Sequence, residues 1–166
     1  AIGYYGDRGD EVLTEASTPG DDFLAGVCLA WEAATAAAAD AGIRTVHLRT
    51  GIVLDPDGGA LGKQLLPFKL GLGAKAGSGR QWMSWITLHD EIRAIRFALE
   101  HDGVRGPVNL TAPQPVTNAD FTDAVGEAVH RPTFLTIPSF LRKAPLGVGG
   151  LVESLLLVSQ RCEPAA

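Results

Sequence analysis

The sequence predicts an α/β protein built on a parallel sheet. Segments rich in β-branched residues alternate with segments whose apolar residues recur every three or four positions. The helical segments are short and flanked by glycine or proline, as crossovers between parallel strands require. The 166 residues are 46% hydrophobic and 20% charged, which is ordinary globular usage and excludes a disordered, collagenous or disulfide-rich chain.

The first third of the chain is predicted to hold a loop, a helix and a strand. Residues 1–20 are rich in Gly and Asp and indicate a strand end followed by a loop. Asp21 or Asp22 is a suitable N-cap for a helix over Phe23–Asp40, which Gly42 ends. The helix has an apolar stripe that favours packing on a sheet over a flexible alanine linker, formed by Phe23, Leu24, Val27, Cys28 and Trp31. A strand rich in β-branched residues follows over Ile43–Leu54.

The rest of the chain continues the alternation of helices and strands. Helices are predicted over residues 60–70, 90–100 and 118–130, the first bent at Pro67 and the last capped by Thr117 or Asn118. Strands are predicted over residues 81–88, 107–110 and 133–137. Residues 71–79 contain four glycines and are predicted to be a loop, and the apolar segment from Pro138 onward is predicted to be helical.

Charge and composition exclude several classes of protein. The net charge of −5 argues against a nucleic-acid partner, and no apolar run suggests a membrane span. The two cysteines are far apart, which favours a reducing compartment and a cytoplasmic location. The chain lacks an initiator Met, so we expect a fragment. Residues 58–89 have no acidic side chain and carry four basic ones, which form either a solvated face or the rim of a pocket for an anionic ligand: Lys63, Lys69, Lys75 and Arg80.

Several sequence motifs of known binding and catalytic sites are incomplete here or lie in the wrong structural context. Gly71–Ala76 has the spacing of a dinucleotide-binding turn, but it follows a helical segment rather than a strand. Gly62-Lys63 lacks both the earlier glycine and the following Ser or Thr of a phosphate loop. The four histidines share no ligand spacing, so no metal site is expected. No Gly-x-Ser-x-Gly turn supports a serine hydrolase.

A series of segments follows in a characteristic order: Ala1–Asp7, Phe23–Glu32, Arg49–Leu54, Gly77–Trp82, Trp85-Ile86 with Asp90, Pro115–Asn118 and Ser159–Arg161. Taken together, they resemble the extended short-chain dehydrogenase/reductase superfamily, in its epimerase-family (nucleoside-diphosphate-sugar-epimerase-like) branch. The resemblance implies the edge of a doubly wound, Rossmann-like parallel sheet with a small α+β substrate-binding region. The Gly-rich half of such proteins has no counterpart here, and we expect the C-terminal region to be truncated.

The resemblance also implies a division of the chain into four parts. Residues 1–55 would be the remnant of the dinucleotide-binding domain, and residues 56–81 a loop and helix of the substrate region. Residues 82–112 would return to the sheet as strand, helix and strand, and residues 113–166 would form the C-terminal substrate-binding region.

The same resemblance assigns candidate ligand contacts. Thr50, Gly51, Ile52 and Val53 match a segment that touches the nicotinamide end of NAD or NADP through its backbone, with a plain strand as the alternative. The substrate is expected to be a small molecule, with an anionic one as an alternative, and its candidate contacts are Lys63, Arg80, Gln81 and Trp85. The isolated chain is not expected to bind the cofactor, because the pyrophosphate site belongs to the missing Gly-rich turn.

The superfamily's catalytic pair is absent. It uses Tyr-x-x-x-Lys on one helix, where the lysine lowers the pKa of the tyrosine and the phenol exchanges a proton. Aligned on Glu32, the tyrosine position holds Leu24 and the lysine position holds Cys28. Tyr4 and Tyr5 are candidates for a displaced proton donor, with packing as the alternative. Met83 and Ser84 replace the Arg-Asp of many nucleotide-sugar enzymes, which argues against a nucleotide-sugar substrate.

Three hypotheses about function follow from these residues. The first is part of a nicotinamide-dependent, epimerase-like oxidoreductase. The second is a non-catalytic NAD(P)-binding sensor or scaffold, and the third is a structural remnant without a ligand. An unpaired sheet edge also predicts self-association.

Overall fold

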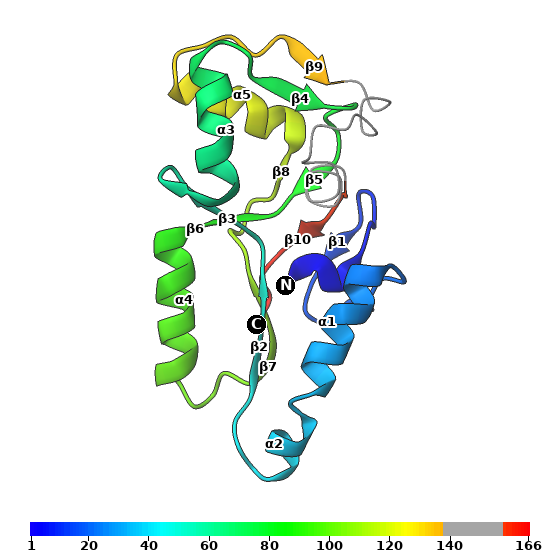
Figure 1. Ribbon diagram of the computed structural model, residues 1–166. Coiled ribbons are helices and arrows are strands. Elements are labelled where there is room, and N and C mark those ends of the chain that lie inside the picture. The colour runs from blue at the N-terminus through cyan, green and yellow to red at the C-terminus, as the bar shows by residue number, and fades with distance from the viewer. Residues whose placement is uncertain (138–157) are drawn as a thin grey trace.

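The α/β class is confirmed, and a parallel strand pair runs along the middle of the molecule. The computed structural model describes residues 1–137 and 158–166. Strand β2 (Val46–Thr50) pairs in parallel with β7 (Gly106–Leu110). Figure 1 shows α1 (Phe23–Ala33) and α4 (Leu88–Glu100) on opposite sides of this pair. The predicted helix from Pro138 onward lies outside the described residues.

The predicted helix over residues 23–40 is interrupted. Asp22 caps α1 by accepting a hydrogen bond from the backbone N–H of Ala25, as predicted from the sequence. The helix ends at Ala33, and α2 covers only Ala36–Asp40. At the break, the hydroxyl of Thr35 lies 2.8 Å from both the carbonyl oxygen of Glu32 and Nε2 of His47 on β2. This side chain joins the helical segment to the strand and competes with a regular helical turn.

The predicted strand over residues 43–54 is divided at Gly51 into β2 and β3 (Ile52–Asp55). After Gly51 the chain leaves β7, and strand β3 pairs in parallel with β6 (Trp85–Thr87). The helix that follows β6, α4, is capped by the hydroxyl of Thr87. The switch of partner at Gly51 directs the chain from the central pair toward the far end of the molecule (Figure 1).

The far end is a small α+β region. It contains α3 (Gly59–Lys69), α5 (Asn118–Ala128), the parallel pair β4 (Ala74–Ala76) and β9 (Leu135–Ile137), and the antiparallel pair β5 (Trp82–Met83) and β8 (Val116–Thr117). Its core is formed by Phe68, Met83, Phe121 and Val125. Residues 71–79, predicted to be a loop, contain β4, because strand β9 supplies a partner that the local sequence does not reveal.

The beginning and the end of the chain share a second core. The 3-10 turn η1 (Ile2–Tyr5) is followed by β1 (Val12–Leu13), which pairs in parallel with β10 (Arg161–Cys162). Ile2, Tyr5, Leu13 and Cys162 form this core. The side chain of Gln160 donates hydrogen bonds to the carbonyl oxygens of Ile2 and Gly6, so the C-terminal segment fixes the N-terminal turn.

Large apolar side chains remain exposed on both helices that flank the central pair. Phe23 and Trp31 on α1 are 81% and 65% exposed, and Leu99 on α4 is 71% exposed. A soluble monomer rarely leaves such surfaces uncovered, and self-association, predicted above from an unpaired sheet edge, stays a prediction. Contrary to the sequence-based expectation, one stretch of the described chain, Phe23–Asp40, has the length and composition of a membrane-spanning helix. This stretch is largely exposed among the described residues and is broken at Thr35.

Candidate functional site

A cavity of about 530 Å³ lies between η1, α1 and the strands β3 and β5. This volume is within the range of small-molecule sites. All four predicted cofactor contacts, Thr50 to Val53, line it. The other lining residues of the described chain are Ala1, Ile2, Gly3, Asp22, Leu24, Val27, Cys28, Trp31, Ala60, Trp82, Met83, Ser84, Val158 and Gln160.

Gly51 shapes one wall of the cavity because no other residue fits there. Its N–H donates to the carbonyl oxygen of Leu110 on β7, at 3.0 Å, while the N–H of Ile52 donates to that of Ser84, at 2.8 Å. A Cβ at Gly51 would lie 2.7 Å from the same Ser84 oxygen, closer than non-bonded atoms approach. The strand therefore changes partners within one residue only because this position is glycine, and residues 50–53 pass along the cavity.

Leu24 and Cys28 face the cavity from α1. Their four-residue separation places them on the same side of the helix, and both lie against Gly3 of the N-terminal turn. The thiol of Cys28 donates to the carbonyl oxygen of Ala1 at 3.7 Å, and burial raises its pKa. At neutral pH these two positions therefore carry an apolar group and a neutral thiol, neither of which serves as an acid–base relay.

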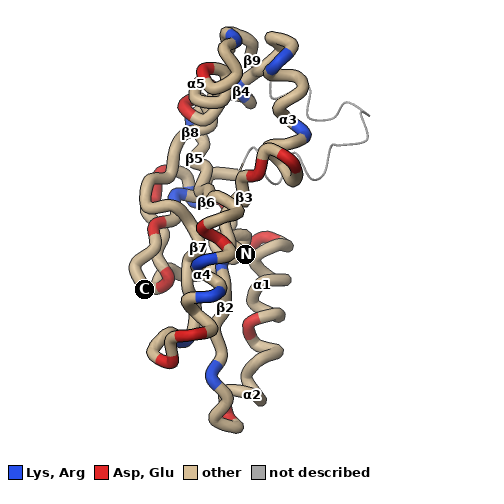
Figure 2. Tube along the Cα trace, turned by 90° about the vertical axis from the view of Figure 1, so that its left-hand side faces the viewer, with Lys and Arg blue, Asp and Glu red and all other residues tan. Residues whose placement is uncertain are grey.

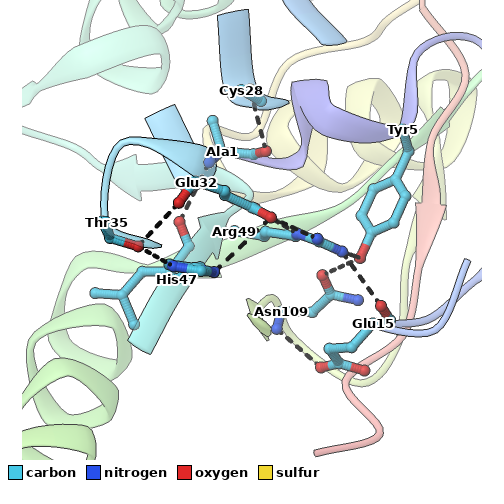
Figure 3. Close-up of polar contacts among 10 residues, drawn as sticks. Ala1, Tyr5, Glu15, Cys28, Glu32, Thr35, His47, Arg49 and Asn109 are labelled. Atoms are coloured by element: carbon cyan, nitrogen blue, oxygen red, sulfur yellow. Dashed lines mark hydrogen bonds and ion pairs between the residues drawn. The ribbon is translucent and has the colours of Figure 1, made fainter. Parts of the chain in front are cut away.

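The two tyrosines are part of the interior behind this cavity. Tyr5 is fully buried, and its hydroxyl donates to Oδ1 of Asn109 at 2.7 Å and accepts from Arg49 at 3.0 Å (Figure 3). Burial raises the pKa of Tyr5. The Arg49 guanidinium lies 3.4 Å from the centre of the Tyr4 ring, which meets Tyr5 edge-on. The geometry favours packing, the alternative named for both residues, and neither lies among the described residues that line the cavity.

Arg49 is the centre of a buried polar network that the sequence did not reveal. It is 3% exposed and donates through Nε and Nη2 to both carboxylate oxygens of Glu32, at 2.8 and 2.9 Å (Figure 3). It also donates to the carbonyl oxygen of Glu15 at 3.3 Å. Burial opposes the charge of Arg49, but the hydrogen bonds with Glu32 and Tyr5 raise its pKa overall. The hydrogen bond from Arg49 lowers the pKa of Glu32. The network fastens α1, β2 and the N-terminal turn together, and so supports the cavity wall.

The predicted substrate contacts lie elsewhere. None of Lys63, Arg80, Gln81 and Trp85 is among the described residues that line the cavity. Lys63 and Arg80 are exposed, and Figure 2 shows the basic residues of α3 separated from α1. The Trp85 indole donates to the carbonyl oxygen of Gln114, and the Gln81 amide donates to that of Ala76. Their role in binding a substrate stays a prediction.

Other residues, among them the three that lie between Gln81 and Trp85 in the sequence, line the cavity instead. Trp82, Met83 and Ser84 line the cavity from β5 and the turn after it. Gln160 approaches from the C-terminal segment, which contributed to the family resemblance but was not predicted to contact a ligand. The described residues contain no group of three His, Cys, Asp or Glu side chains that could hold a metal ion.

Comparison with curated proteins shows relatives along the whole chain. An epimerase family protein of Mycobacterium bovis is 50% identical over all 166 residues. The epimerase family protein YfhF of Bacillus subtilis is 39% identical over 165 residues. The chain is similar over its whole length to epimerase family proteins. It spans about half the length of these relatives, 54% and 53% respectively. No family model matches the chain.

Solved structures of the epimerase family agree with the fold. The human epimerase family protein SDR39U1, crystallised with NADPH, superposes with a TM-score of 0.85 at 37% identity, over 97% of this chain and 54% of the human protein. A nucleoside-diphosphate sugar epimerase of Corynebacterium glutamicum gives 0.72 at 39% identity, over 96% of this chain and 37% of that protein. The UDP-glucose 4-epimerase of Thermotoga maritima shares only the fold, at 17% identity and a TM-score of 0.67.

Proposed function

We propose that the protein containing this chain is an NADPH-dependent, epimerase-like oxidoreductase, and that the cavity holds the nicotinamide end of the cofactor. The observation that carries the proposal is that Thr50 to Val53 line a cavity of ligand size, at the point where the strand changes partner. In open α/β sheets ligands bind outside the carboxyl ends of the strands, and residues 50–53 begin at the carboxyl end of β2. NADPH rather than NADH is proposed as the cofactor because the human relative at 37% identity was solved with NADPH.

A second function, NADPH binding without catalysis, is favoured by the residues at the catalytic positions. Leu24 and Cys28, which stand at the positions predicted for the catalytic tyrosine and lysine, both line the cavity. The helix is therefore not shifted in a way that would bring other residues to these two positions. A missing proton relay typically lowers a rate by roughly 10²–10⁴-fold. Turnover of carbonyl substrates by the full-length protein distinguishes the two functions, since a sensor binds NADPH and oxidises none of it.

The binding experiment uses the full-length protein and two variants of equal exposure on α1. Leu24 is 40% exposed and lines the cavity, whereas Leu29 is 41% exposed and is not among the lining residues. Leu24→Trp fills the cavity and should weaken NADPH binding about tenfold, because overfilling a packed site costs about 1–3 kcal/mol. Leu29→Trp should change it less than about twofold. Equal NADPH affinity in both variants, measured by titration calorimetry, would place the nicotinamide elsewhere.

A further inference from the structure

The polar side chains of the cavity have few hydrogen-bond donors to offer. The hydroxyl of Thr50 donates to Glu91, and that of Ser84 donates to the carbonyl oxygen of Gln160. The Trp82 indole donates to Asp10 at 2.9 Å, and the Cys28 thiol is engaged with Ala1. Among the described lining residues this leaves one unengaged side-chain donor, the indole N–H of Trp31, whose residue is 65% exposed.

Gln160 offers an acceptor instead. Both N–H groups of its amide can be used within the protein, since Nε2 lies 3.1 Å from the Ile2 oxygen and 3.2 Å from the Gly6 oxygen. Two carbonyl oxygens can be satisfied only by the amino end of the amide, which fixes its orientation. The amide oxygen accepts no hydrogen bond from any described residue, while Gln160 itself lines the cavity.

The charge of the cavity is equally one-sided. Asp22 is the one lining residue with a charged side chain in the described part of the chain, and it is negative. The amino group of Ala1 donates to the carbonyl oxygen of Leu48. Many of the other described lining residues are apolar, among them Ile2, Val27, Ile52, Val53 and Met83. An anion would lose its hydration here, which is costly, and the one cation among the described lining residues, the Ala1 amino group, already donates to Leu48.

We propose that the cavity takes a neutral, largely apolar substrate that donates a hydrogen bond to Oε1 of Gln160. This inference rests on the proposed function, since it names the substrate that would lie beside the nicotinamide. It excludes from this part of the site the phosphate groups of a nucleotide sugar. It also replaces the expectation of an anionic ligand at Lys63 and Arg80, which lie outside the cavity wall.

The test uses probes of nearly constant shape with the full-length protein, with and without saturating NADPH. 2-Naphthol is neutral and donates a hydrogen bond, 2-methoxynaphthalene is neutral and only accepts one, and 2-naphthoate is an anion. UDP-glucose represents a nucleotide sugar. In calorimetric titrations with the wild-type protein, 2-naphthol should bind roughly 2–10-fold more tightly than 2-methoxynaphthalene, the value of one net hydrogen bond. 2-Naphthoate and UDP-glucose should bind more weakly than 2-naphthol.

Three variants assign the preference to Gln160. Gln160→Met removes the acceptor and should abolish the difference between 2-naphthol and 2-methoxynaphthalene. Gln160→Glu loses the same donors to Ile2 and Gly6 but keeps an acceptor, and should retain the preference. Gln64→Met, a half-buried position on α3 outside the cavity lining, is the control and should behave as the wild type.

The outcomes separate this inference from the proposed function. A wild-type protein that binds 2-naphthoate or UDP-glucose more tightly than 2-naphthol, or that binds none of the probes, overturns the inference without any variant. Loss of NADPH affinity in Gln160→Met with unchanged probe binding would overturn it too, because Gln160 would then contact the cofactor. Probe binding with the expected order but no NADPH binding would support the inference while refuting the proposed function.

Discussion

Replacing Glu32 with glutamine should destabilise the protein strongly although it changes only one atom of the side chain. Glu32 gives both carboxylate oxygens to Arg49, at 2.8 and 2.9 Å. Glutamine has one oxygen and one amino group, so one of the two guanidinium donors would face another donor. Arg49 is 3% exposed, and its charge would remain buried without a balancing anion.

The expected loss is about 3 kcal/mol. Breaking a buried ion pair by removing one partner costs about 3–5 kcal/mol. The lower end applies here, because the Glu32 side chain is 21% exposed and Arg49 keeps its hydrogen bonds to Tyr5 and to the carbonyl oxygen of Glu15. A loss of this size is a large part of the free energy of unfolding of an ordinary domain.

Urea denaturation measures the effect as a shift of the midpoint at constant slope. The control is Glu100→Gln, which breaks an equally short pair, Arg96–Glu100 at 2.7 Å, whose side chains are 75% and 53% exposed. That exposed pair should contribute less than about 0.5 kcal/mol. Losses below about 1 kcal/mol for Glu32→Gln, or equal losses in the two variants, would refute the view that Arg49 depends on this carboxylate.

Three further predictions concern pH, Gly51 and the thiols. Arg49 lowers the pKa of Glu32, so the stabilisation from this pair is complete above the ordinary glutamate pKa of about 4.3 and is lost as pH falls through the lower, folded-state value. In acid titrations followed by circular dichroism, the stability of Glu32→Gln should therefore fall less steeply with pH than that of the wild type. Gly51→Ala should cost about 2 kcal/mol or more in urea denaturation, because its Cβ would meet the Ser84 oxygen at 2.7 Å, whereas Gly103→Ala has nothing within 4 Å and should be nearly neutral; similar midpoints would contradict the clash. Burial raises the pKa of Cys162 to about 12, so at pH 8 a thiol reagent should label Cys28, which lines the cavity, well before Cys162, and NADPH should slow the labelling of Cys28; labelling of Cys162 first would show that its core opens readily.

Local patterns predicted much of the fold. Asp22 caps α1 and Thr117 caps α5 in the structure because a capping side chain bonds to backbone groups two or three residues away, which is a local interaction. The limits of α4 and β7 agree with the sequence-based expectation to within two residues at each end. The break at Thr35 was missed, because its partner His47 lies on a strand twelve residues away.

The candidate site was predicted in part, and the difference has a physical cause. The sequence by itself predicted that Thr50 to Val53 belong to a strand and showed that glycine stands at position 51, and the family resemblance predicted leucine and cysteine in place of the catalytic pair. Only the tertiary structure decided which side chains share the cavity: it places Gln160 there from the far end of the chain and directs Trp85 toward Gln114 instead. The identity and spacing of residues are properties of the chain, whereas the direction of a side chain depends on partners distant in sequence. The carboxylate that balances Arg49 and the carbonyl oxygens that orient Gln160 are such partners, and no local pattern contains them.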